Sequence, residues 1–227
     1  MAKQELFERS PIRAFDAAAN GGLKAGELGL ITAKKGLGKT PVLVQFGMDT
    51  LLNGKQLVHV SFDQHSNESV KYSYDNIYNE IAKKKTIPNA AEVKEQISRN
   101  RTILNFNQDN FNLEKVVNTL NALKAGGIAV AGVVIDDVDL SKCKEADIQA
   151  VSSYAKATKT KIWISSTNAE DTLEAQAPKA LLSYFYGIVH LESKGKETAM
   201  QILKMGKATI IESTLKVDTK TWLITAK

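Results

Sequence analysis

The sequence has very few residues that could form covalent cross-links or bind soft metals. Its 227 residues include one cysteine, Cys143, so no internal disulfide is possible. The three histidines, His59, His65 and His190, are isolated from one another, and this argues against a metal site built from histidine and cysteine. We interpret Cys143 as a structural thiol and expect a cytoplasmic protein, because a reducing compartment suits a chain without disulfides.

Long apolar runs are also missing. No run approaches the roughly 20 residues that span a bilayer, and the first residues lack the apolar stretch of a signal peptide. We therefore expect a soluble protein without a membrane partner. The net charge is +5, but lysines and arginines are scattered among acids, so a nucleic-acid partner is permitted and not indicated. The run Lys83-Lys84-Lys85 favours a solvated helix end over a nucleic-acid contact.

The composition is that of an ordinary globular protein, with 43% hydrophobic and 24% charged residues. We predict a single domain over residues 1–227. It comprises an approach segment (1–26), an α/β core (27–186) and a C-terminal β extension (187–227). Strands and helices alternate through the core, which indicates a mainly parallel sheet flanked by helices. After residue 187 only strands are expected, as an antiparallel extension of the same sheet.

The hydrophobic periodicity gives the expected elements. Strands are predicted at 27–32, 56–62, 102–106, 128–135 and 161–165, and then at 188–191, 200–204, 208–217 and 221–225. Helices are predicted at 39–52, 113–124 and 145–157, with mostly helical patterning at 66–100 and broken helical pieces at 171–186. Trp163 should lie in the core. Tyr72, Tyr74 and Tyr78 have helical spacing, which favours packing over stacking on nucleic-acid bases.

One segment matches the phosphate-binding loop pattern, except that Ala33 replaces its first glycine: Ala33-Lys34-Lys35-Gly36-Leu37-Gly38-Lys39-Thr40. It follows a predicted buried strand and opens a helix, which is the context that the motif requires. The backbone N–H groups of such a loop turn toward phosphates, and the helix start adds its positive end. Lys39 would reach the terminal phosphates, and the Thr40 hydroxyl would ligate magnesium. We therefore expect ATP and Mg²⁺ as ligands.

Pro41 directly follows Thr40 in the first turn of this helix. Proline fits there sterically because first-turn N–H groups have no partner within the helix. In a phosphate loop, however, those N–H groups bind the nucleotide, and the one after the threonine usually faces the α-phosphate. Pro41 has no such donor. The sequence thus predicts weak ATP binding unless Lys34 or Lys35 compensates.

A second motif, Val133-Val134-Ile135-Asp136-Asp137, is an apolar strand that ends in two carboxylates. It is a candidate Walker B strand. At the carboxyl edge of the sheet, Asp136 could hold magnesium through water while Asp137 orients neighbouring groups. The alternative is that both are loop acids that cap the next segment.

Together with these motifs, Phe15-Asp16, Gly21-Gly22-Leu23 and Gly26-Glu27 resemble the N-terminal segment of KaiC-type and DnaB-type members of the RecA superfamily. The resemblance covers nearly the whole chain, and the helicase branch commonly carries alanine where Ala33 stands. It implies an open RecA-like sheet in which the Walker A and B strands flank a sensor strand. It also implies self-assembly that places the nucleotide between neighbouring subunits.

The resemblance implies further site residues. The strand that ends at Phe62 should be followed by a glutamate that activates water, and Asp63 stands there, one methylene shorter. Asp63 is either a working base or a structural acid. Ser166 stands where the helicase branch usually has glutamine. Ser166 or Asn168 either senses phosphate or simply caps the end of the strand, and the sequence does not decide between these two roles.

In the same family a late strand delivers a cation to the neighbour's nucleotide. Lys204 is the candidate for this role, and Gly206 occupies the place of a familiar arginine. Because such a cation speeds phosphoryl transfer, its loss would leave turnover slow. The alternative for Lys204 is an ordinary solvated lysine on a strand.

The preferred function is therefore an ATP-binding RecA-like protein, a slow Mg²⁺-dependent ATPase that acts in a homo-oligomer or beside a larger ATPase, DNA-linked or regulatory partner. The main alternative is a degenerate regulatory or structural module that no longer hydrolyses ATP, and Asp63, Gly206 and Pro41 favour it. A third alternative, a nucleic-acid-binding accessory protein, rests on the modest basicity alone and predicts steep salt dependence.

Overall fold

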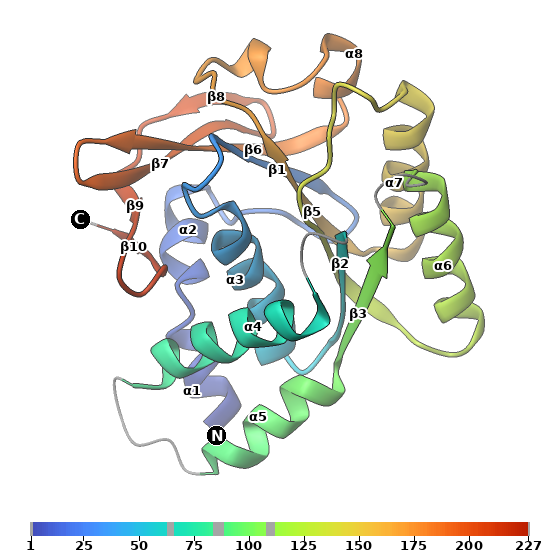
Figure 1. Cartoon of the computed structure of the whole chain (residues 1–227), viewed down its shortest axis with the longest axis vertical. Helices are drawn as coiled ribbons and strands as arrows, with labels where there is room; N and C mark the ends of the chain where they lie inside the picture. The colour runs from blue at the N-terminus through green and yellow to red at the C-terminus, as the bar shows by residue number, and fades with distance from the viewer. Residues whose placement is uncertain (1, 63–65, 84–88, 108–111, 227) are drawn as a thin grey trace.

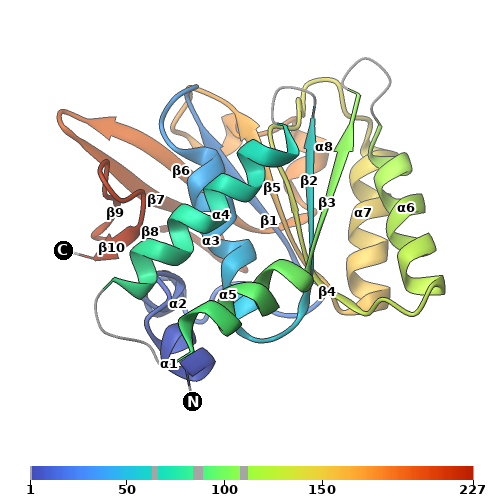
Figure 2. The ribbon, with the colours of Figure 1, turned by 60° about the horizontal axis from the view of Figure 1, so that its bottom comes forward.

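The computed structural model describes residues 2–62, 66–83, 89–107 and 112–226 (Figure 1). The strands of this part form one sheet in the order β10-β9-β7-β6-β1-β5-β4-β2-β3, and β8 pairs with β7. Helices cover both faces: α6 and α7 lie on one side of the central strands, and α3, α4 and α5 lie on the other (Figure 2). The expected α/β fold, mainly parallel with antiparallel strands at the C-terminal end, is confirmed.

The parallel core contains β1 (Leu28–Ala33), β2 (Gln56–Phe62), β3 (Arg101–Phe106), β4 (Val130–Ile135), β5 (Lys161–Thr167) and β6 (Phe185–Lys194). β5 lies between β1 and β4, in agreement with the expected order of a sensor strand between the two motif-bearing strands. Because these strands are parallel, their carboxyl ends share one edge, where ligands bind in open α/β sheets.

The antiparallel part contains β7 (Glu197–Met205), β8 (Ala208–Ile211), β9 (Leu215–Val217) and β10 (Ile224–Ala226). The prediction that residues 188–191 belong to this part is wrong, because β6 pairs with β1 in parallel. The segment before β6 holds a 3₁₀ turn, Leu173–Ala175, and α8 (Lys179–Leu182), and this crossover is long enough for a parallel return.

Two C-terminal strands are shorter than predicted. Residues 208–217 form two strands instead of one, and Ile210 in the first has a left-handed φ of 51°. The strand predicted at 221–225 begins only at Ile224, because Trp222 has a φ of 62°. The value at Trp222 interrupts the extended backbone that a strand requires. Ile210, in contrast, lies within β8, and the division of 208–217 falls at residues 212–214, which form no strand.

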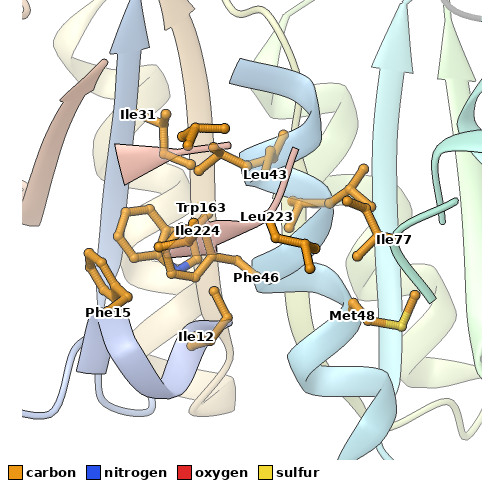
Figure 3. Close-up of a cluster of buried hydrophobic side chains, with 14 of the residues drawn as sticks. Ile12, Phe15, Ile31, Leu43, Phe46, Met48, Ile77, Trp163, Leu223 and Ile224 are labelled. Atoms are coloured by element: carbon orange, nitrogen blue, oxygen red, sulfur yellow. The ribbon is translucent and has the colours of Figure 1, made fainter. Parts of the chain in front are cut away.

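The N-terminal segment contains two helices that the periodicity did not indicate, α1 (Ala2–Glu8) and α2 (Ile12–Ala18). Each has seven residues, which is too short for a clear amphipathic pattern. Phe15 of α2 packs edge-on against Phe46 at a ring distance of 5.0 Å, and Phe46 stacks on Trp163 at 4.1 Å (Figure 3). Trp163 is 4% exposed, so its assignment to the core is confirmed.

On the same face lie α3 (Lys39–Leu52), α4 (Asn67–Ala82) and α5 (Ala90–Arg99). The other face carries α6 (Leu113–Ala125) and α7 (Glu145–Thr158). The predicted bounds of 39–52 and 56–62 are confirmed. Tyr74 and Tyr78 are buried as expected, whereas Tyr72 is 68% exposed.

Lys83 is exposed at the end of α4, while Lys84 and Lys85 lie outside the described residues. None of the helices in the described part of the chain is both long and apolar enough to cross a membrane.

Candidate functional site

The segment of residues 33–40, here called the 33–40 loop, joins β1 to α3 at the carboxyl edge of the sheet. Gly36 and Gly38 have φ values of 88° and 91°, which glycine adopts without steric cost. Gly38 is the N-cap of α3 and offers no capping side chain, so first-turn N–H groups stay available to an anion. Lys34, Lys35 and Gly36 are exposed. The backbone of the loop therefore suits the binding of an anion such as phosphate.

Lys39 points its side chain toward the ends of the central strands and is 8% exposed. Its Nζ donates a hydrogen bond to Thr167 Oγ1 at 2.9 Å and lies 3.9 Å from Asp137 Oδ1. Burial lowers the pKa of Lys39, whereas the charges of Asp137 and Asp136 raise it. A desolvated ammonium group with only distant ion pairing gains strongly from a phosphate brought close to it.

Thr40 and Asp136 place two oxygen ligands side by side. Thr40 Oγ1 donates to Asp136 Oδ2 at 2.6 Å, and the Ser165 hydroxyl donates to the other carboxylate oxygen. Asp136 is 1% exposed. Among the described residues no group of three or more His, Cys, Asp or Glu side chains could hold a metal. The pair nevertheless fits Mg²⁺, which is usually bound by one or two protein oxygens plus phosphates and water.

Thr167, at the end of β5, connects the lysine to the second carboxylate. Its hydroxyl accepts from Lys39 and donates to Asp137 Oδ1 at 2.8 Å. Asp137 has a φ of 55°, and its backbone N–H donates to Ser165 Oγ at 2.7 Å. Lys39, Thr167 and Asp137 are thus linked by one set of hydrogen bonds, and Thr40 and Asp136 by another.

The chain matches the protein-family model "ATPase: KaiC" over residues 9–215. It belongs to the KaiC ATPase family. The matched range contains the 33–40 loop, Asp136 and all six parallel strands. A search of curated proteins finds no match. Membership in the KaiC ATPase family supports an ATP-binding RecA-like P-loop protein.

Sequence reasoning missed Thr167, although β5 carried a signal. Successive side chains of a strand point to opposite faces. Trp163 packs on the face that holds α3, whereas Ile162 and Ile164 pack on the face that holds α7. Residue 167 has the parity of Trp163 and therefore points to the lysine. A core tryptophan thus identifies the face on which a polar residue at the strand end reaches the site.

In this KaiC-family domain the two sensor candidates lie elsewhere. Ser166 is 5% exposed and has the opposite parity to Thr167. Asn168 contacts the end of β1 through its backbone, because its N–H donates to Ala33 O at 3.0 Å. Its side chain donates to Ala175 O and accepts from Glu170 N. The structure brings neither side chain to Lys39.

Of the two catalytic candidates, Lys204 lies apart from the 33–40 loop, and Asp63 is not among the described residues. Lys204 is half-buried on β7, opposite Ile188, and its Nζ donates to Leu182 O at 3.1 Å. Burial lowers the pKa of Lys204. Ile188 pairs with Leu30, so Lys204 is level with the middle of β1 and not with its carboxyl end.

The structure supplies a reason for the glycine at 206. Gly206 has a φ of 64° in the turn between β7 and β8, and an added β-carbon would lie 2.9 Å from the Tyr186 hydroxyl oxygen. A side chain there would be strained by both the backbone and the contact. An arginine at this position therefore does not suit the hairpin of this chain.

Proposed function

We propose that the protein binds Mg²⁺-ATP at the 33–40 loop and hydrolyses it slowly, in a homo-oligomer or beside a larger ATPase, DNA-linked or regulatory partner. The convergence of Lys39, Thr40 and Asp136 from two separate segments supports this function. A lysine and a hydroxyl at the start of a helix, together with a carboxylate at the end of a strand, form the set that phosphates and magnesium need.

In this proposal Lys39 exchanges its hydrogen bond with Thr167 for the terminal phosphates. Thr40 and Asp136 hold the magnesium ion, which when bound neutralises phosphate charge. The exposed Lys34 and Lys35 contribute positive charge beside Gly36, and Leu37 and Gly38 supply backbone. Thr167 and Asp137 orient Lys39 while no phosphate is present.

Hydrolysis requires a base and a second cation. We assign the base to Asp63 because β2, which ends one residue before it, lies beside β4 in the sheet. We assign Lys204 to the nucleotide of a neighbouring subunit, since within its own chain it is level with the middle of β1. Ser166 or Asn168 would then sense the phosphate only after the end of β5 moves toward the 33–40 loop.

A second function, that of a RecA-fold module without hydrolysis, is favoured by Pro41 and Gly206. Pro41 removes an N–H group from the first turn of α3, and Gly206 leaves no arginine on the β7–β8 hairpin. The two functions differ in phosphate release and not in the fold.

The test is a calorimetric titration of ATP and ADP with Mg²⁺, together with an assay of phosphate release. Lys39→Ala and Lys39→Met should weaken binding by at least about tenfold, because each removes a hydrogen bond to a charged group. Lys39→Met keeps an aliphatic side chain in the buried position. Lys55→Met, at the opposite edge of the sheet, is the matched control. Equal affinity in the Lys39 variants would contradict nucleotide binding at this loop.

A further inference from the structure

The C-terminal turn of residues 218–224 lies against the 33–40 loop. A β-carbon built on Gly38 would be 2.8 Å from Cζ3 and 3.0 Å from Cε3 of Trp222, so the indole packs directly on this glycine. Trp222 is partly buried and joins the same hydrophobic cluster as Leu37 and the inner face of α3. One of the two tryptophans of the chain therefore contacts the loop that we assign to phosphate.

The backbone of this turn is held in an uncommon conformation. Trp222 has a φ of 62°, which a bulky residue rarely adopts. The carboxylate of Asp218 accepts hydrogen bonds from Lys220 N at 2.9 Å and from Thr221 N at 2.8 Å, and the N–H of Trp222 donates to Asp218 O at 2.7 Å. Strain of this kind persists only where surrounding contacts determine it.

Gln45 of α3 ties this turn to the helix that begins at the loop. Its side chain is 1% exposed. Its Nε2 donates to Pro41 O at 3.0 Å and to Trp222 O at 2.8 Å, and its Oε1 accepts from Ile224 N at 2.8 Å. Leu223 and Ile224 lie beside Leu43 and Phe46 of α3 (Figure 3). One buried amide thus joins the first turn of α3 to the backbone of Trp222 and Ile224.

The ends of the 33–40 loop are held by contacts of Ala33, Lys39 and Thr40, whereas its middle, residues 34–36, is exposed. No described atom lies within 4 Å of a β-carbon built on Gly36. The backbone N–H groups that follow Gly38 must keep one direction to bind an anion. A loop that is ordered before binding gains affinity, because the ordering cost is already met.

We propose that the turn of residues 218–224 positions the 33–40 loop, with Trp222 as the positioning residue and Gln45 as the side chain that fixes the turn to α3. Trp222 holds Gly38 in its left-handed conformation and so directs the N–H groups of Lys39 and Thr40. For its nucleotide readout this inference rests on the proposed function, but its effect on the loop does not.

The experiment compares Trp222→Ala, Trp222→Phe and Gln45→Ala with the full-length wild type. Hydrogen exchange of the amides of residues 36–40 is measured without nucleotide, and calorimetry measures the affinity for Mg²⁺-ATP. Thr225→Val is the matched control, because Thr225 Oγ1 donates to Lys216 O within the β9–β10 pair, away from the loop. Chemical denaturation verifies that each variant is folded.

Trp222→Ala and Gln45→Ala should speed loop exchange and weaken ATP binding by about tenfold. Trp222→Phe should restore most of both, since a flat ring still covers Gly38, and Thr225→Val should change neither. Unchanged loop exchange in Trp222→Ala, or faster exchange with unchanged affinity, overturns the proposal. If Trp222→Ala does not fold, Gln45→Ala decides between the same outcomes. Faster exchange in a protein whose wild type binds no ATP supports the positioning role and rejects the proposed function.

Discussion

Replacing Gly38 by alanine should destabilise the protein more than the same change at Gly36, although the two residues have nearly the same φ, 91° and 88°. Alanine in the left-handed region loses roughly 1–2 kcal/mol relative to its favoured conformations. That strain is common to both positions. The surroundings differ, because a β-carbon at Gly36 meets no described atom within 4 Å, whereas one at Gly38 overlaps the indole of Trp222.

Forcing a methyl group against a packed ring typically costs about 1–3 kcal/mol. Gly36→Ala should therefore lower the free energy of unfolding by about 1–2 kcal/mol, and Gly38→Ala by about 2–5 kcal/mol. A domain of ordinary stability, about 5–15 kcal/mol, would still fold at the lower of these losses. The difference between the two variants, about 1–3 kcal/mol, measures the contact with Trp222.

Urea denaturation of both variants measures these losses. The double variant Gly38→Ala/Trp222→Ala separates them further, because removing the ring relieves the overlap and leaves the backbone strain. Its loss should be smaller than the sum of the two single losses. Equal losses for Gly36→Ala and Gly38→Ala, within about 0.5 kcal/mol, would refute the contact between the turn and the loop.

Three further predictions concern binding, turnover and pH. Pro41→Ala should tighten Mg²⁺-ATP binding about tenfold to a hundredfold in calorimetry, because it restores an N–H donor to a charged ligand. An unimproved affinity would mean that the loop does not hold the α-phosphate through this group. Asp63→Asn should slow phosphate release by about a hundredfold or more while ATP affinity is kept, as expected of a general base. Unchanged release would make Asp63 a bystander. Burial lowers the pKa of His190, while Asp171 and Glu192 act in the opposite direction. In this pH range the unfolded chain therefore binds a proton at His190 that the folded chain does not. The free energy of unfolding should consequently fall as pH drops from about 7 to 5. In urea denaturation, His190→Gln should make the free energy of unfolding less dependent on pH.

The parts of the site that sequence predicted are those fixed by local chemistry. Gly36 and Gly38 need left-handed angles, Lys39 opens the helix, and Asn53-Gly54 ends it, so the loop and α3 follow from a few neighbouring residues. The apolar run that ends at Asp136 likewise defines a buried strand with a carboxylate at its end. In each case the signal and its structural consequence lie within one turn or one strand.

The parts that sequence did not predict depend on pairing between distant segments. Nothing near Trp222 in the sequence indicates that its ring covers Gly38, because the contact arises only when the turn between β9 and β10 meets Gln45 of α3. The direction of β6 depends on the crossover before it, and its own residues do not reveal whether its partner is parallel. The position of Lys204 along the sheet likewise follows only from the register of β7 against β6.

The two ends of the site differ in completeness. At the end where we propose that magnesium binds, Thr40, Asp136 and Ser165 are already joined by hydrogen bonds, and Thr167 holds Lys39 beside them. At the other end, Pro41 offers no N–H group, and its carbonyl accepts from Gln45, which also fixes the turn that carries Trp222. Pro41, which has no N–H group to offer in the first turn of α3, is therefore also hydrogen-bonded to the side chain that holds the turn of Trp222. Terminal phosphates and magnesium would then supply most of the binding free energy, and the ordered loop would offset part of what the missing N–H loses.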